Sequence, residues 1–215
     1  RKVISITTIF FTVLSITVSL ILSNIYSSSA ILYPNDEQQN MSSVLSSYSS
    51  LANFAGVDLP GEGTSKSEEA IERLKSFDFF KNHFLPYVKL ENLMAVKEWS
   101  SESNVVTYNK KIFNNKTNQW IRKVKFPKKQ KPSSQEAYEE FSKIFSVSAD
   151  KETNFVKISL EHESPHIAKE WLDIIVKNIN ESMRDFDIAN AENAIDFLYK
   201  RSNDTNILEI KEAIS

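Results

Sequence analysis

The chain has 215 residues and carries 26 Lys and Arg against 28 Asp and Glu, a formal net charge of −2 at pH 7. This balance argues against nucleic-acid binding through overall charge and against an acidic disordered tail. The absence of cysteine excludes disulfides, thiolate zinc sites and cysteine nucleophiles. With 41% apolar residues, the chain can bury the core of one domain, with or without appendages.

The first segment differs from this average, because residues 3–26 contain no charged side chain and follow the basic pair Arg1-Lys2. Some two dozen helical residues at about 1.5 Å each would extend roughly 35 Å, enough to cross a hydrocarbon core of about 30 Å. Its many Ser and Thr hydroxyls can bond to helical carbonyls. We therefore predict a transmembrane helix over 3–26, with residues 1–2 as a cytoplasmic stub and the rest exported. A cleaved signal peptide is the weaker alternative, because its apolar region is usually about 7–15 residues long.

The next part of the chain predicts short helices and strands bounded by turn residues. After residue 105 the apolar residues recur at every second position, which is typical of strands, instead of at every third or fourth position. The asparagine-rich segment 114–118 predicts a hairpin between two such strands. Ser133 and Glu136 have the spacing of a capping box, which predicts a helix start. The predicted elements are a strand at 30–33, helices at 38–54 and from 65, a short helix within 90–99, strands at 105–113 and 120–126, a helix from 132 and a strand at 156–160.

The last fifty residues predict a long helix. Ser164-Pro165 is a favourable helix start, no Gly or Pro follows it, and apolar residues recur at spacings of three and four. Such a helix would reach roughly 75 Å at about 1.5 Å per residue, so its apolar stripe must pack on other helices, in this chain or in neighbouring subunits. The polar segment 202–206 leaves two consecutive helices as an alternative. We expect an α+β protein with a periplasmic α/β domain at 27–163, containing a small mixed sheet, and a truncated helical arm at 164–215.

The sequence predicts no catalytic residue, no cofactor and no metal site. The segment His162-Glu163-Ser164-Pro165-His166 has the pattern H-E-x-x-H, which binds zinc when both histidines lie one turn apart on a helix. Pro165 would interrupt that helix, so we expect His162 at a strand end and His166 in the first turn of the next helix. We expect solvated surface for the carboxylate pairs 68–69 and 139–140, and core packing for the aromatic residues within 77–84.

A basic stretch is the candidate contact site. Its side chains could attract anionic lipid headgroups at a membrane or acidic sugars through screened electrostatic attraction. The alternative is a solvated hairpin arm and loop without a ligand, and nucleic acid is not an expected partner on the exported side. The stretch consists of Arg122, Lys123, Lys125, Lys128, Lys129 and Lys131.

Several short segments, in a fixed order, carry a resemblance to a known family. They are Leu51-Ala52-Asn53-Phe54-Ala55-Gly56-Val57, Ala70-Ile71-Glu72-Arg73-Leu74-Lys75-Ser76, Pro132-Ser133-Ser134-Gln135-Glu136-Ala137, Val147-Ser148-Ala149-Asp150-Lys151 and Ser164-Pro165-His166-Ile167-Ala168-Lys169-Glu170-Trp171-Leu172. Together with the apolar helix and the short strand that precede them, these segments resemble the polysaccharide co-polymerases, the Wzz-like chain-length determinants of lipopolysaccharide O antigen.

The resemblance implies a bacterial inner-membrane protein whose bulk is periplasmic and whose subunits form a homo-oligomeric ring. Such a ring would act with the O-antigen polymerase and the growing polysaccharide to set the chain length of O antigen or a related surface polysaccharide. It implies no enzymatic activity and no cofactor. Because the sequence stops inside the helical region, we expect it to be the family's N-terminal part. The alternative function is the periplasmic sensor domain of a membrane receptor kinase. A periplasmic adaptor of an efflux or secretion assembly is a weaker alternative, because adaptors contain Gly-rich β segments and this chain has three Gly.

Overall fold

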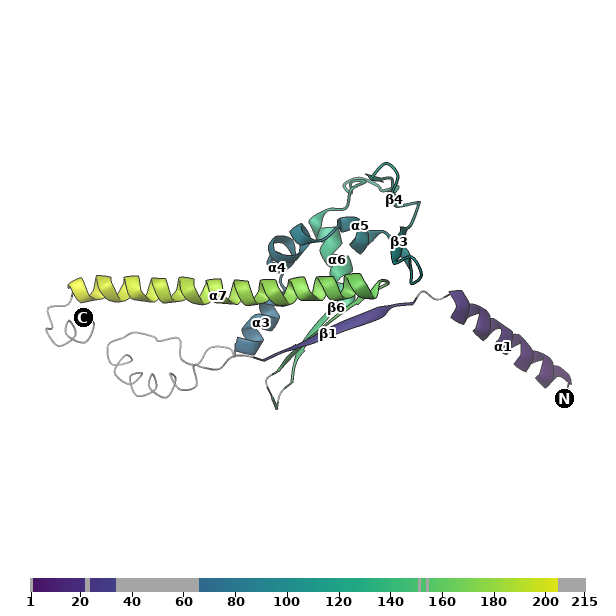
Figure 1. Cartoon of the computed structure of the whole chain (residues 1–215), viewed down its shortest axis with the longest axis horizontal. Coiled ribbons are helices and arrows are strands. Elements are labelled where there is room, and N and C mark those ends of the chain that lie inside the picture. Colours follow the sequence, from purple (N-terminus) through teal and green to yellow (C-terminus); the bar gives the residue numbers. More distant parts are fainter. Residues whose placement is uncertain (1, 22–23, 34–65, 151, 154, 205–215) are drawn as a thin grey trace.

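The computed structural model describes residues 2–21, 24–33, 66–150, 152–153 and 155–204 (Figure 1). Within these residues the protein is α+β: a small sheet and several short helices form a body, and a long helix extends away from it. The predicted helix at 38–54 and the last residues of the predicted arm lie outside the described residues.

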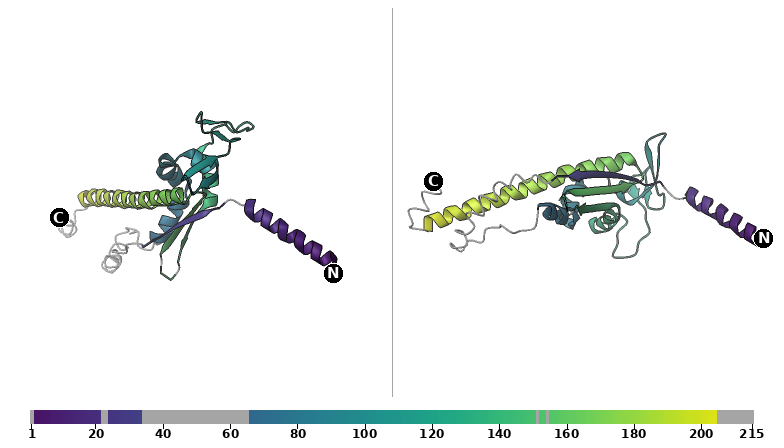
Figure 2. Two further views of the ribbon diagram at one scale, coloured as in Figure 1. Left: turned by 45° about the vertical axis from the view of Figure 1, so that its right-hand side comes forward. Right: turned by 90° about the horizontal axis from the view of Figure 1, so that it is seen from below.

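The first described element is helix α1, Lys2–Ile21, whose apolar side chains between Val3 and Ile16 are exposed. Threonine hydroxyls along α1 donate to carbonyls one turn earlier, as predicted: Thr8 to Ile4 at 2.8 Å and Thr12 to Thr8 at 2.9 Å. In Figures 1 and 2, α1 points away from the body.

The predicted transmembrane helix at 3–26 is wrong. In the part of the chain that the structure describes, no helix is both long enough and apolar enough to cross a membrane. The predicted segment was too long, because Asn24 and Ile25 are not helical and Tyr26 already belongs to a strand. Seven of the 20 residues of α1 are also Ser or Thr, which dilutes its apolar character. The same finding contradicts the predicted location, which was the inner membrane through a single span.

The central sheet contains β1 (Tyr26–Leu32), β6 (Phe145–Ala149) and β7 (Val156–His162), in the order β1-β7-β6. Both pairings are antiparallel. The predicted alternation in β7 is confirmed, because Val156, Ile158 and Leu160 are buried while the residues between them are more exposed. One face of β7 therefore packs into the core.

An aromatic core lies against that face. It is built from α3 (Lys66–Lys75), α4 (Phe77–Phe79), the π-helical turn η1 (Phe80–Phe84) and the 3₁₀ turn η2 (Leu85–Tyr87). Phe84 is fully buried, with its ring centroid 4.7 Å from that of Phe141 and 5.5 Å from that of Trp171. The predicted core role of the aromatic residues within 77–84 is confirmed for Phe79, Phe80 and Phe84.

The remaining body contains α5 (Leu90–Met94), β2 (Val96–Ser100), β3 (Val105–Tyr108), β4 (Phe113–Asn114), β5 (Gln119–Trp120) and α6 (Ser134–Ile144). The predicted strand at 105–113 is confirmed only for Val105–Tyr108, because the chain turns at Asn109, whose carbonyl accepts from the Ile112 and Phe113 amides. β3 pairs with β2 instead. The predicted hairpin turn is present, but β4 and β5 pair over two residues each rather than over long strands.

Helix α7, Pro165–Asp204, has 40 residues and so extends about 60 Å. Its first half packs on the sheet and on η1 through a buried stripe that includes Trp171, Ile175 and Ile179. Two contacts with α3 mark the end of this packing: the Arg73 guanidinium lies 4.5 Å from the centre of the Phe186 ring, and Lys66 pairs with Asp187 at 2.5 Å. Beyond them we call residues 188–204 the arm; its described side chains are exposed, and it projects past the body (Figures 1 and 2).

Candidate functional site

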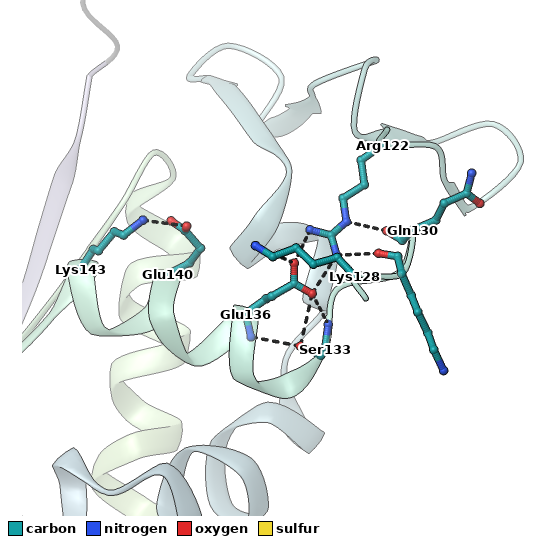
Figure 3. A network of polar contacts seen from close by, with 8 residues as sticks. Arg122, Lys128, Gln130, Ser133, Glu136, Glu140 and Lys143 are labelled. Atoms are coloured by element: carbon teal, nitrogen blue, oxygen red, sulfur yellow. Dashed lines mark hydrogen bonds and ion pairs between the residues drawn. The ribbon is translucent and has the colours of Figure 1, made fainter. Parts of the chain in front are cut away.

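The basic stretch lies in the loop between β5 and α6, and Arg122 differs from the lysines. Its Nε donates to the Gln130 carbonyl and its Nη2 to the Lys129 carbonyl, both at 2.7 Å. Its guanidinium also makes a two-pronged ion pair with Glu136, at 2.7 Å to Oε1 and 2.9 Å to Oε2 (Figure 3). Arg122 therefore closes the loop 123–130 at both ends and ties it to α6. We call this arrangement the Arg122 clamp.

Glu136 holds its place in the clamp because it also completes the capping box of α6, as predicted. The Ser133 hydroxyl accepts from the Glu136 amide, and the Glu136 carboxylate accepts from the Ser133 amide. The hydrogen bond from Arg122 is the main cause that lowers the pKa of Glu136 from 4.5 to about 2; burial opposes it and the Ser133 amide adds to it. Glu136 thus stays ionised, and both its oxygens are occupied.

The five lysines are exposed instead. Lys128 reaches Glu136 at 3.7 Å, but its side chain is 59% exposed. The other four form no hydrogen bond or ion pair through their side chains among the described residues; they are Lys123, Lys125, Lys129 and Lys131. Phe126, in the same loop, is 96% exposed. The structure thus brings a structural arginine together with several free ammonium groups, which can attract an anion but offer no nucleophile.

The H-E-x-x-H pattern is divided between two elements, as predicted. His162 ends β7, and His166 lies in the first turn of α7. The His162 ring is buried; its Nδ1 accepts from the Ser164 amide at 2.8 Å, and its Nε2 lies 3.0 Å from the Asn92 carbonyl. Through these two contacts the His162 ring fastens the β7–α7 turn to α5.

The carboxylate pairs also have structural partners. Glu69 pairs with Arg73 at 3.2 Å and Glu140 pairs with Lys143 at 2.7 Å. Glu68 and Glu139 are exposed. This agrees with the prediction that both pairs lie on the solvated surface of helices.

Sequence reasoning missed the partner of Arg122. Glu136 was recognised only as part of a capping box, and no local signal connects a loop arginine to a carboxylate 14 residues later. The pairing exists only because the loop returns to the N-terminus of α6.

Residues 1–84 match the family model described as "Wzz: Chain length determinant protein". This segment runs from α1 to Phe84 at the centre of the aromatic core. No curated protein matches the chain.

Over residues 1–84 the match confirms the resemblance to the Wzz-like chain-length determinants that was drawn from the sequence. Proteins of this family regulate chain length rather than act as enzymes, and the match supports such a role in polysaccharide synthesis. The comparisons give no support to the alternative, a sensor domain of a receptor kinase.

Proposed function

We propose that this protein is a homo-oligomeric co-polymerase that sets the chain length of O antigen or a related surface polysaccharide together with its polymerase. The observation that carries the proposal is the match of residues 1–84 to the chain-length determinant family. Regulation without catalysis agrees with a body whose histidines and clustered carboxylates have structural partners. The division of the chain into a domain at 27–163 and a helical region from 164, whose outer part is the arm, belongs to the same proposal.

The arm supports assembly into a ring of subunits. Ile188, Ile195 and Tyr199 are 50%, 52% and 60% exposed, respectively. Their spacings of seven and four residues place them on one side of the helix. An apolar stripe on a helix that extends beyond its own core is stabilised when it packs on a neighbouring helix. The occupant we propose is the same helix of another subunit.

The exposed lysines of the basic stretch support contact with the growing polysaccharide. Because the Arg122 clamp holds both ends of the loop, the ammonium groups of Lys123, Lys125, Lys128 and Lys129 are displayed on a fixed base. Their attraction to an acidic glycan or an anionic headgroup would be long-ranged but weakened by salt. Arg122 itself is a positioning residue in this proposal.

Deleting the gene and restoring it tests the function. We expect the modal cluster of long polysaccharide chains on a gel to collapse to an unregulated ladder and to return on complementation. An unchanged length distribution in the deletion strain would contradict a role in chain length.

Two arm variants test the assembly. Ile195→Lys places a charge in the apolar stripe, so we expect it to lower the oligomeric mass by light scattering and to fail to restore the modal cluster. Asn190→Lys adds the same charge about half a turn away from Ile188, on the other side of the helix, and should behave as wild type. Equal behaviour of the two variants would refute assembly through the stripe.

A further inference from the structure

A half-open pocket of about 540 Å³ lies where α5, the β4–β5 hairpin and the start of α6 meet. Its volume falls in the range of about 300–1,000 Å³ that is typical of small-ligand sites. Leu85, Val88 and Leu90 contribute an apolar wall from η2 and α5, and Pro132 contributes from the start of α6. The pocket thus combines segments more than forty residues apart in the sequence.

Two structural features hold the pocket open in a fixed shape. Trp120 pairs with Phe113 across the β4–β5 hairpin, with ring centroids 5.1 Å apart, and Phe113 is buried. The Arg122 clamp then fixes the segment that follows the hairpin onto α6. Lys131 follows Gln130, whose carbonyl accepts from Arg122, so the clamp also holds the backbone at Lys131, which lines the pocket together with Trp120.

Among the described residues, the side chains of Lys89, Glu91, Asn118 and Lys131 form no hydrogen bond or ion pair, and the Trp120 indole N–H donates to no acceptor. The pocket therefore presents two ammonium groups, one carboxylate, one amide and one indole around an apolar wall. Polar groups that several elements bring to one pocket, beside apolar side chains, are a common feature of ligand sites.

We propose that this pocket binds one acidic sugar unit of a polysaccharide, a hexuronate or a chemically similar saccharide. The proposal rests on the proposed function, which makes a polysaccharide the molecule that this protein meets. A pyranose ring has an apolar face of C–H groups that can pack on Trp120, and a rim of hydroxyls that can bond to Glu91 and Asn118. Lys89 and Lys131 would bind the carboxylate through charge-assisted hydrogen bonds.

Neutral sugars would leave both ammonium groups without a counter-charge, and a free anion would leave the indole and the amide unused. The acidic saccharide is the ligand that uses all five groups. Lys131 is also the member of the basic stretch that joins the pocket to the exposed lysines of the loop, so a polysaccharide seated here would continue along that loop.

The three tryptophans of the chain provide a local test by NMR, because each indole N–H gives its own signal. The Trp99 indole donates to Asn104 and Trp171 is buried in the core, so these two signals serve as internal references. Trp120→Phe identifies the third signal by its loss. The full chain is titrated separately with tetragalacturonate, with maltotetraose as the neutral probe and with inorganic phosphate as the free anion.

We expect tetragalacturonate to shift the Trp120 signal in a saturable manner and to leave the Trp99 and Trp171 signals in place. Lys131→Gln should weaken this binding roughly tenfold through the loss of a charge-assisted hydrogen bond. The matched control Lys157→Gln, which removes the same charge from an exposed residue of β7 outside the pocket and outside the basic stretch, should weaken it less than about twofold because that charge is screened.

Three results would overturn the proposal: no shift at Trp120 with tetragalacturonate, an equal effect of maltotetraose or phosphate, or an equal loss in the Lys131 and Lys157 variants. The test is independent of the deletion experiment. Binding at Trp120 in a protein whose deletion leaves chain length unchanged would retain the pocket and reject the proposed function. No binding at Trp120 in a protein whose deletion alters the chain length would reject the pocket and retain the proposed function.

Discussion

Replacing Glu136 with Gln removes one charge from the Arg122 clamp and changes little else. Gln at the third helical position can still accept from the Ser133 amide, so the capping box of α6 survives. Arg122 keeps its bonds to the carbonyls of Lys129 and Gln130. The Glu136→Gln variant therefore isolates the contribution of the ion pair to the free energy of unfolding.

The lowered pKa of Glu136 sets the size of this contribution. A pKa of about 2 against an ordinary 4.5 corresponds to a ceiling of about 3 kcal/mol, at 1.36 kcal/mol for each pKa unit. The side chains of Arg122 and Glu136 are 15% and 13% exposed, so water still screens part of the interaction. We therefore expect Glu136→Gln to lower the free energy of unfolding by about 1–2 kcal/mol at pH 7.

The pH dependence provides the sharper test. Because the folded state lowers the pKa of Glu136, the stabilisation is complete above the unfolded value near 4.5 and is lost as the pH falls toward 2. Urea unfolding followed by the fluorescence of the buried Trp171 should show the difference between variant and wild type at pH 7 and show it fading toward pH 2. A difference that is equal at both pH values would refute the ionic origin. Glu140→Gln, which breaks an exposed pair with Lys143, serves as the control and should change stability by less than about 0.5 kcal/mol.

The core and the helix cap give further predictions that the same unfolding assay can check. Phe84→Ala empties the space between Phe141 and Trp171 and should cost about 3–5 kcal/mol; a cost under about 1 kcal/mol would mean that this cluster is not tightly packed. Ser133→Ala removes the N-cap hydroxyl of α6 and should cost about 1 kcal/mol, with no effect if the Glu136 side chain alone caps the helix.

The sequence predicted which basic residues belong to the candidate site, but not how they are arranged. The sequence identified the basic residues, but it could not separate Arg122 from the lysines, because that difference depends on the return of the loop to α6. The pocket was missed altogether. Its groups come from positions as far apart as Lys89 and Lys131, each of which alone resembles an ordinary surface residue.

Local signals determined several elements of the fold from the sequence by itself. Ser133 and Glu136 specified the start of α6, alternation in β7 specified its buried face, and Pro165 specified where α7 begins. Each depends on residues within one or two turns of the chain, where capping, side-chain period and proline geometry act directly.

Only the tertiary structure decided which segments meet. It paired β3 with β2 rather than with the segment after residue 119, shortened the predicted apolar helix by starting β1 at Tyr26, and joined Arg122 to Glu136. Strand partners and ion pairs between distant residues depend on loop closure and on the packing of the whole core, which no local pattern encodes.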